Sequence, residues 1–124
     1  MIKAEIRINR TLPTELIKLM NKCGERKRSP KTVIKALRDG LFMAGLYVDG
    51  ELVAFGRVSG DGAMYFLITD VMVDPAYEDS GVDMQLYKEI DDFLLAVAPN
   101  DSRVLAMTNK KYESVFRKIG RAHV

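Results

Sequence analysis

An acidic loop with a single glycine is the stretch of this chain best placed to do chemistry. It follows the apolar residues 64–73 and Asp74-Pro75, and it reads Glu78-Asp79-Ser80-Gly81-Val82-Asp83 before an amphipathic segment. A strand that turns into a helix N-terminus presents unpaired backbone N–H groups and partial positive charge, which suit an anion such as phosphate. The three carboxylates of the loop oppose that use, because each repels a nearby phosphate. The sequence therefore predicts an anion-binding loop whose own negative charges repel the anion.

Cysteine and histidine, which often form a nucleophile and its base, occur once each. Cys23 lies in the first quarter of the chain and His123 lies near its end. A catalytic thiol needs an activating partner, so we predict a structural cysteine and keep a nucleophile as the alternative. A lone cysteine forms no internal disulfide, and no apolar run is long enough for a leader or a membrane span. We expect a cytoplasmic protein with no metal ion in its site.

Charge is distributed unevenly along the chain. Residues 1–60 carry twelve Lys and Arg against six Asp and Glu, whereas residues 61–100 carry nine acidic residues against Lys88 alone. This acidic block repels polyanions, so we do not expect nucleic acid as a partner. The run Arg26-Lys27-Arg28 is the exception. It could guide an acidic substrate or bind nucleic acid, although a solvated loop before a helix start at Ser29-Pro30 is the favoured interpretation.

The hydrophobic pattern predicts five strands and four helices within one domain of residues 1–124. Asp49-Gly50 between two β-rich runs is typical of a type I′ hairpin turn, Thr11 or Thr14 is the expected cap of the first helix, and Gly24 is expected to end that helix. The order β-α-α-β-β-β-α-β-α indicates an α+β or mixed α/β domain. The expected strands are 2–8, 42–48, 52–58, 64–73 and 103–107, and the expected helices are 16–23, 33–37, 82–97 and 109–119.

The segment LYVDGELVAFGRVSGDGAMYFLITDVMVDPAY, residues 46–77, resembles the second to fourth strands of the GNAT superfamily of N-acetyltransferases. The resemblance extends over nearly the whole chain. It implies a central, mostly antiparallel sheet whose fourth strand diverges from the fifth, with acetyl-CoA in the gap. It also implies acyl transfer by direct attack of a small-molecule or peptide amine. The chain ends where the family adds a final hairpin, so we expect a homodimer as one way to cover the sheet edge.

Acetyl-CoA would be held, by this resemblance, by the fourth strand and by the loop that follows it. The strand would contribute the backbone of Val71, Met72 and Val73. The loop would contribute Glu78, Asp79, Ser80, Gly81, Val82 and Asp83, and the last helix Asn109 and Phe116. The family pattern in the loop is Gln/Arg-x-x-Gly-x-Gly/Ala, of which Gly81 is retained, and Ser80 stands where a cation is common. Weak or lost acetyl-CoA binding is therefore an open alternative.

The same resemblance implies roles in catalysis. Asp70 would be the general base for the amine, and a structural carboxylate is the alternative. Phe116 stands where the family has its acidic tyrosine and cannot donate a proton, so Tyr112 is the candidate acid, with a core tyrosine as the alternative. Tyr47, Arg57 and Tyr65 would line the substrate side or would be ordinary cross-strand residues. A GNAT-like binding or assembly module without catalysis remains the rival function.

Overall fold

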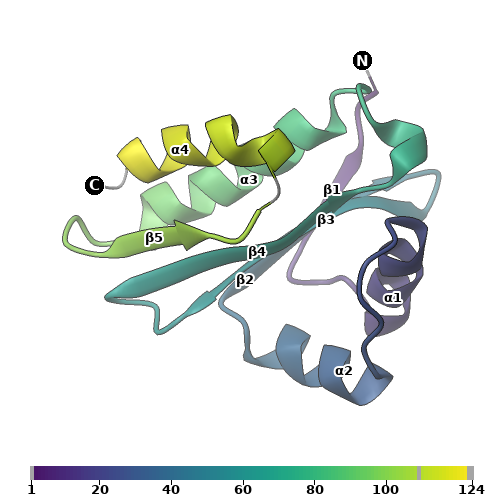
Figure 1. The fold of residues 1–124 in the computed structure, drawn as a ribbon, viewed down its shortest axis with the longest axis horizontal. Helices are drawn as coiled ribbons and strands as arrows, with labels where there is room; N and C mark the ends of the chain where they lie inside the picture. The colour runs from purple at the N-terminus through teal and green to yellow at the C-terminus, as the bar shows by residue number, and fades with distance from the viewer. Residues whose placement is uncertain (1, 109, 123–124) are drawn as a thin grey trace.

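The computed structural model describes residues 2–108 and 110–122. The predicted order of strands and helices is confirmed, with two short 3₁₀ helices in addition (Figure 1). The elements are β1 (Glu5–Ile8), α1 (Pro13–Lys22), α2 (Pro30–Asp39), β2 (Phe42–Val48), β3 (Glu51–Gly60), β4 (Tyr65–Val73), η1 (Pro75–Tyr77), α3 (Val82–Val97), β5 (Arg103–Ala106), η2 (Lys110–Tyr112) and α4 (Glu113–Ala122).

One five-stranded sheet with the order β1-β2-β3-β4-β5 forms the centre of the fold. The pairs β1–β2, β2–β3 and β3–β4 are antiparallel, and β4–β5 is parallel. The β2–β3 hairpin turns at Asp49 and Gly50, whose φ angles of 52° and 78° are those of a type I′ turn. The mixed, mostly antiparallel sheet predicted from the sequence is confirmed.

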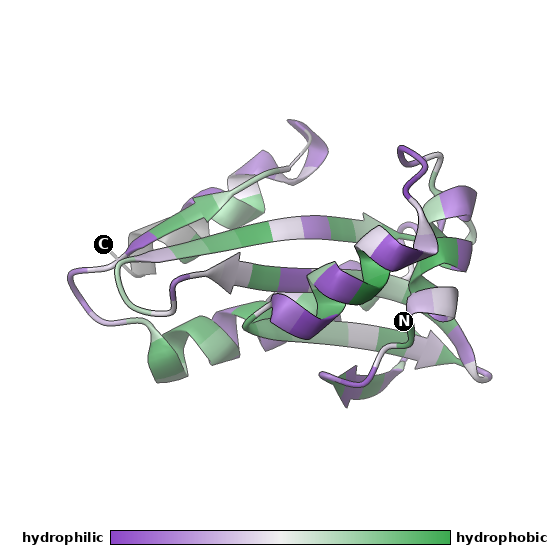
Figure 2. Ribbon diagram, turned by 90° about the horizontal axis from the view of Figure 1, so that it is seen from below, coloured by the Kyte–Doolittle hydropathy of each residue, from purple (hydrophilic) through white to green (hydrophobic). Residues whose placement is uncertain are grey.

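The helices cover the two faces of this sheet. In Figure 1, α1 and α2 lie on one face, while α3 and α4 lie on the other. The larger core, under α3 and α4, includes Phe66, Ile68 and Leu86, and the smaller core, under α1 and α2, includes Leu19 and Phe55. In Figure 2 the strands are largely apolar, while the helices carry both apolar and polar residues. An apolar helix face packs on the sheet and leaves the polar face to solvent. Within the described residues, no helix has the length and apolarity needed to cross a bilayer.

The start of α1 differs from the prediction. Its N-cap is Leu12, and the backbone N–H of Leu12 donates to the Glu15 carboxylate at 2.9 Å. Neither Thr11 nor Thr14 caps the helix. Thr11 is buried, and its hydroxyl is hydrogen-bonded to the Tyr47 hydroxyl instead. A residue that a propensity rule assigns to a cap is thus used by the core.

Two ends of the fold also differ from the predicted ranges. The first strand starts at Glu5 rather than Ile2, because the residues before it bond to the β4–α3 region: the Ile2 N–H donates to the Ser80 carbonyl, and the Ala4 N–H donates to the Gln85 side chain. The final helical segment, predicted to begin at residue 109, is divided into η2 and α4. The first change ties the start of the chain to the acidic loop.

Candidate functional site

An irregularity in β4 places Asp70 at the centre of the candidate site. Phe55 pairs with Met72 and Arg57 pairs with Thr69, so two β4 residues lie opposite the single Gly56 of β3. This is a β-bulge, and Asp70 takes a positive φ of 56° within it. Bulges commonly redirect a side chain near a site. Here the bulge makes Asp70 part of a groove on the α1–α2 face.

The parallel pairing of β4 and β5 stops short of the bulge. It runs from Tyr65–Arg103 to Ile68–Ala106, and the Met107 N–H adds one bond to the Ile68 carbonyl at 2.8 Å. From Thr69 onward, the β5-facing side of β4 has no strand partner among the described residues. The diverging strands therefore leave backbone donors and acceptors available to a ligand.

A groove of about 290 Å³ lies beside the bulge, between the α1–α2 pair and the sheet. A second, more open hollow of about 480 Å³ adjoins it along α2 and shares Thr32, Ala36, Arg57 and Ser59 with it. Residues from six parts of the chain line the groove, and its surface is largely apolar. Its lining residues are Leu16, Met20, Arg28, Thr32, Val33, Ala36, Leu37, Arg57, Ser59, Leu67, Thr69, Asp70 and Met107.

Two predicted site residues meet in this groove. Arg57 Nε donates to Asp70 Oδ2 at 2.6 Å, and the two side chains are only 18% and 21% exposed. Such a short, charge-assisted bond fixes both side chains. The other carboxylate oxygen, Oδ1, bonds to none of the described residues. Asp70 therefore has a structural partner and still presents an acceptor to the groove.

The acidic loop has a defined backbone. Asp79 and Gly81 both have positive φ, at 64° and 95°, and Gly81 is the N-cap of α3. The Ser80 hydroxyl donates to the Tyr77 carbonyl at 2.5 Å, so it is turned into the loop. Glu78 and Asp79 are exposed, and the Asp83 carboxylate accepts the N–H of Met84. The loop has the strand–turn–helix form expected from the sequence, with Glu78 and Asp79 directed to solvent.

Sequence reasoning missed a cation that lies against this loop. Lys111 Nζ lies 3.4 Å from Glu78 Oε2, and both side chains are substantially exposed. The neighbouring Tyr112, and then Glu78 and Asp79, raise the pKa of Lys111, which stays protonated. The signal available in the sequence was the pair Lys110-Lys111 after the last strand. One of the three loop acids is thus already paired with a cation from η2.

Tyr112 and Phe116, predicted to act near the cofactor, lie in the core between α3 and α4. Both rings meet the Tyr87 ring edge-on, with centroid separations of 5.7 Å for Tyr112 and 5.4 Å for Phe116. Tyr112 is 8% exposed. Burial raises its pKa, while Lys111 opposes that shift. The Tyr112 hydroxyl therefore stays protonated near neutral pH, and its ring serves the core.

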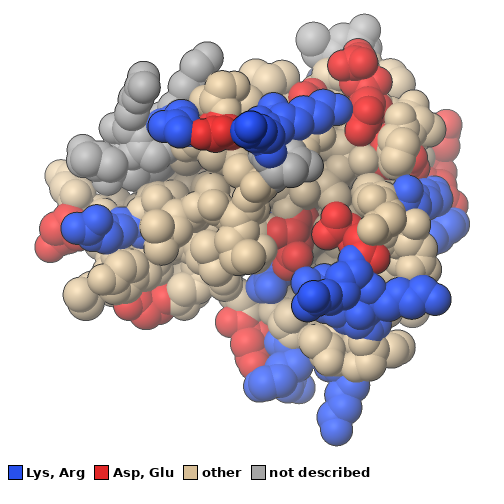
Figure 3. Space-filling model, in the orientation of Figure 1, with Lys and Arg blue, Asp and Glu red and all other residues tan. Residues whose placement is uncertain are grey.

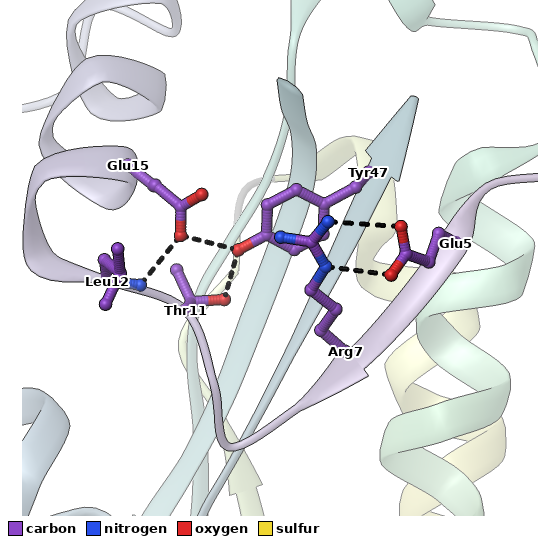
Figure 4. Close-up of polar contacts among 6 residues, drawn as sticks. All are labelled: Glu5, Arg7, Thr11, Leu12, Glu15 and Tyr47. Carbon is purple, nitrogen blue, oxygen red and sulfur yellow. Dashed lines mark hydrogen bonds and ion pairs between the residues drawn. The ribbon is translucent and has the colours of Figure 1, made fainter. Parts of the chain in front are cut away.

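Tyr47 and Tyr65 lie outside the groove. Tyr47 is 1% exposed under α1, and its hydroxyl donates to Glu15 at 2.8 Å and contacts Thr11 at 3.2 Å. The Arg7 guanidinium stacks 3.9 Å from the centre of the Tyr47 ring (Figure 4). Tyr65 begins β4 at the end far from the bulge and is 46% exposed. Of the three predicted substrate residues, Arg57 alone lines the groove.

Cys23 is half-buried at the end of α1. Its thiol donates to the Val73 carbonyl at 3.4 Å, which joins α1 to the end of β4. Burial, followed by the charge of Asp74, raises the pKa of the Cys23 thiol to about 11. A thiol of this kind is a poor nucleophile at neutral pH. His123 and Asn109 lie outside the described residues.

Comparison with solved structures shows which known proteins share this fold. No family model matches the sequence, and no curated protein matches it. Among solved structures, a GNAT-family acetyltransferase from Streptococcus pneumoniae is 20% identical, with 95% of this chain and 86% of that one covered at a TM-score of 0.75.

Two further structures have similar statistics. A protein of unknown function from meticillin-resistant Staphylococcus aureus, a probable acetyltransferase, is 21% identical with coverages of 95% and 89% and a TM-score of 0.86. The ribosomal-protein-S18-alanine N-acetyltransferase from Escherichia coli is 16% identical with coverages of 94% and 77% and a TM-score of 0.70. With its diverging β4 and β5, bulged β4 and flanking helix pairs, the chain has the fold of the GNAT acetyltransferases.

Proposed function

We propose that this protein is an N-acetyltransferase that transfers an acetyl group from acetyl-CoA to an amine bound in the groove. The single observation that carries the proposal is the juxtaposition at Asp70. The bulge lines the groove just beyond the point where β4 separates from β5, so an extended ligand along β4 and an amine in the groove would meet there. We also propose that residues 1–124 act as one cytoplasmic domain.

The residues present fit acetyl-CoA in two places. The β5-facing backbone of Val71 and Val73 would hold the pantetheine arm, although Cys23 already occupies the Val73 carbonyl. The N-terminus of α3, capped by Gly81, would hold the phosphates. Lys111, which pairs with Glu78, would supply the cation that the loop itself lacks. When bound, acetyl-CoA supplies an activated thioester to the site.

Two protons have to be moved in the proposed reaction. The attacking ammonium must lose one, and Asp70 Oδ1 is the acceptor on the groove wall, while Arg57 holds Oδ2 in place. The departing thiolate must gain one, and the proposed donor is Tyr112 of η2, the segment that follows β5. Replacing Tyr112 with Phe retains the ring packing and removes the donor.

Asp70→Asn tests the proposed base. Asparagine also accepts a positive φ, so the bulge is expected to persist. We expect kcat for acetyl transfer to fall by about 100-fold or more, with little change in the affinity for acetyl-CoA. Release of the CoA thiol gives the rate, and calorimetry gives the affinity.

Glu51→Gln is the matched control for Asp70→Asn. Glu51 pairs with Lys18 on the exposed surface and lies outside the groove. The Glu51→Gln variant is expected to transfer acetyl groups at the wild-type rate. An Asp70→Asn rate equal to that of the wild type would exclude Asp70 as the base. The absence of any heat of acetyl-CoA binding at millimolar ligand concentration would overturn the proposed function.

A binding or assembly module without catalysis is the second candidate function. The observation that favours it is the exposure of Glu78 and Asp79 on the loop that would face the phosphates. The combined replacements Asp79→Gly, Ser80→Lys and Asp83→Gly distinguish the two functions. Under the proposed enzyme function, they raise CoA affinity. Unchanged affinity favours the module.

A homodimer is the third part of the proposal. β5 lies at the edge of the sheet, and its Leu105 is 52% exposed. An edge strand with an exposed apolar residue can pair with a second copy. The dimer would extend the sheet through β5.

A further inference from the structure

The two walls of the groove differ in net charge. The wall formed by α1, α2 and their connecting loop contributes Arg28, and the sheet wall contributes Asp70 and Arg57. Arg57 is bound to Asp70, so its charge is compensated locally. Arg28 forms no ion pair with the described residues. The groove therefore has one cation without an ion-pair partner among the described residues, and it shares the groove with Asp70 of the bulge.

The loop that carries Arg28 reinforces this positive potential. Arg26 and Lys27 likewise have no ion-pair partner among the described residues. All three cations line a hollow of about 220 Å³, together with Ile17, Met20 and Asn21. Among the residues that the structure describes, no carboxylate lines that hollow. Figure 3 shows Lys and Arg side chains gathered over the α1–α2 corner of the molecule. Clustered charge of one sign concentrates oppositely charged ligands.

Apolar side chains line both walls of the groove. Met20, Val33 and Leu37 line the helical side of the groove, and Leu67 lines the sheet side. A volume of about 290 Å³ is near the lower limit of small-molecule sites. The groove thus suits a short aliphatic segment with a charged group at each end.

We propose that the acceptor of this site is an amine that also carries an anionic group, with its ammonium directed to Asp70 and its anion bound by Arg28. The inference rests on the proposed function, because it names the class of the acceptor amine. Asp70 Oδ1 offers a hydrogen-bond acceptor to the ammonium. The Arg28 guanidinium offers paired donors to a carboxylate. An amine of the same length without an anionic group would leave Arg28 without a partner.

The neighbouring hollow along α2 does not offer the same recognition. Its Lys35 bonds to Asp39 at 2.8 Å, and Arg38 lies 3.5 Å from the same carboxylate. Lys35, the lysine that lines this hollow, is thus paired with a carboxylate that also lines it. Arg28 is therefore the residue that distinguishes an acidic acceptor from a neutral one.

Equilibrium binding to the full chain without cofactor tests the inference. The probes form a series from γ-aminobutyrate to ε-aminocaproate, each compared with its own amide. The amide keeps the amine and the chain length and removes the negative charge. We expect at least one carboxylate in the series to bind about tenfold more tightly than its amide, measured by calorimetry or by chemical-shift titration.

Arg28→Gln is expected to abolish that tenfold preference, and Arg28→Lys is expected to restore part of it. Lys31→Gln is the matched control, because Lys31 is exposed at the start of α2 and does not line the groove. The preference should persist in that variant. Equal binding of every carboxylate and its amide, or an unaltered preference in Arg28→Gln, would overturn the inference.

The outcomes also separate this inference from the proposed function. Arg28-dependent binding of the carboxylates without acetyl transfer to them would overturn the transferase proposal and leave the anion site supported. Acetyl transfer to amides as efficient as transfer to the acids, by kcat/KM, would support the transferase and overturn the anion site. Folding of each variant is checked by circular dichroism.

Discussion

Asp70 shows how a single backbone angle limits the choice of residue. Its φ of 56° belongs to the left-handed region, which Asp and Asn enter more readily than other side chains. A β-branched residue there would strain the bulge. The residue type at this position thus satisfies the backbone, the ion pair with Arg57 and the proposed proton transfer at once. Loss of activity in Asp70→Asn would consequently report on the carboxylate, through the ion pair or the proton transfer, rather than on the backbone of the bulge.

Tyr47→Phe is predicted to destabilise the fold without altering the groove. The substitution removes the hydroxyl that donates to Glu15 and contacts Thr11 in a buried position. The free energy of unfolding should fall by about 1 to 2 kcal/mol, measured by urea denaturation. Tyr65→Phe, at an exposed residue, should change it by about 0.5 kcal/mol or less. Equal effects of the two variants would contradict the buried network.

Cys23 is predicted to react slowly with alkylating reagents in the native protein. Its pKa of about 11 compares with an ordinary value of 9.0, so the folded state holds the thiol proton more tightly. The associated stabilisation is complete below pH 9.0 and is lost as the pH rises towards 11. Alkylation near pH 8 should be at least about tenfold slower than in urea. Similar alkylation rates in the native and the unfolded protein would contradict the raised pKa of the Cys23 thiol.

Lys111 of η2 pairs with Glu78 of the β4–α3 loop, so Lys111 is expected to affect the binding of CoA at this loop. Lys111→Gln should weaken CoA binding by about threefold to tenfold and leave binding of pantetheine, which lacks the pyrophosphate, unchanged. Glu78→Gln should strengthen CoA binding, because it removes a carboxylate and frees Lys111. Calorimetry measures both affinities.

Lys88→Gln is the control for the Lys111 variant. Lys88 pairs with Asp92 on the exposed face of α3, so its removal alters net charge equally and leaves the loop intact. CoA affinities that change alike in Lys88→Gln and Lys111→Gln would show a general charge effect and exclude a local role for Lys111.

Local sequence signals predicted the elements whose causes are local. Asp49-Gly50 dictated a turn through its positive φ angles, and Gly24 ended α1 with a φ of 67°. The cap of α1 could not be read in the same way, because Thr11 is engaged by Tyr47 from β2. The bulge at Asp70 was also hidden, since it depends on the register between β3 and β4.

The candidate site was predictable only in part for the same reason. The sequence placed Asp70 and Arg57 near the substrate but could not show that they bind one another. Arg28 belonged to a basic run whose favoured interpretation was a solvated loop, and its place in the groove follows from the packing of α1 and α2 on the sheet. Sites assembled from distant segments leave no periodic signal in the chain.

Across the whole molecule, the exposed edge of the sheet predicts self-association. Leu105→Lys should convert the proposed dimer to a monomer, because it places a charge on the pairing strand. Leu95→Lys on the exposed side of α3 is the control, since Leu95 is similarly exposed at 59%. Sedimentation measures the mass of each variant. A wild-type protein that remains monomeric at high concentration would exclude pairing through β5.

The hydrogen bonds from the first residues to the β4–α3 region also affect the order of folding. The Ala4 N–H donates to the Gln85 side chain across 81 positions, and Gln85 donates in turn to the Ile2 carbonyl across 83 positions. Contacts of such sequence separation form late, because a long loop must close first. The acidic loop is therefore expected to reach its final shape after the β2–β3 hairpin has formed. Ligand binding at this loop would then report the last stage of folding rather than the first.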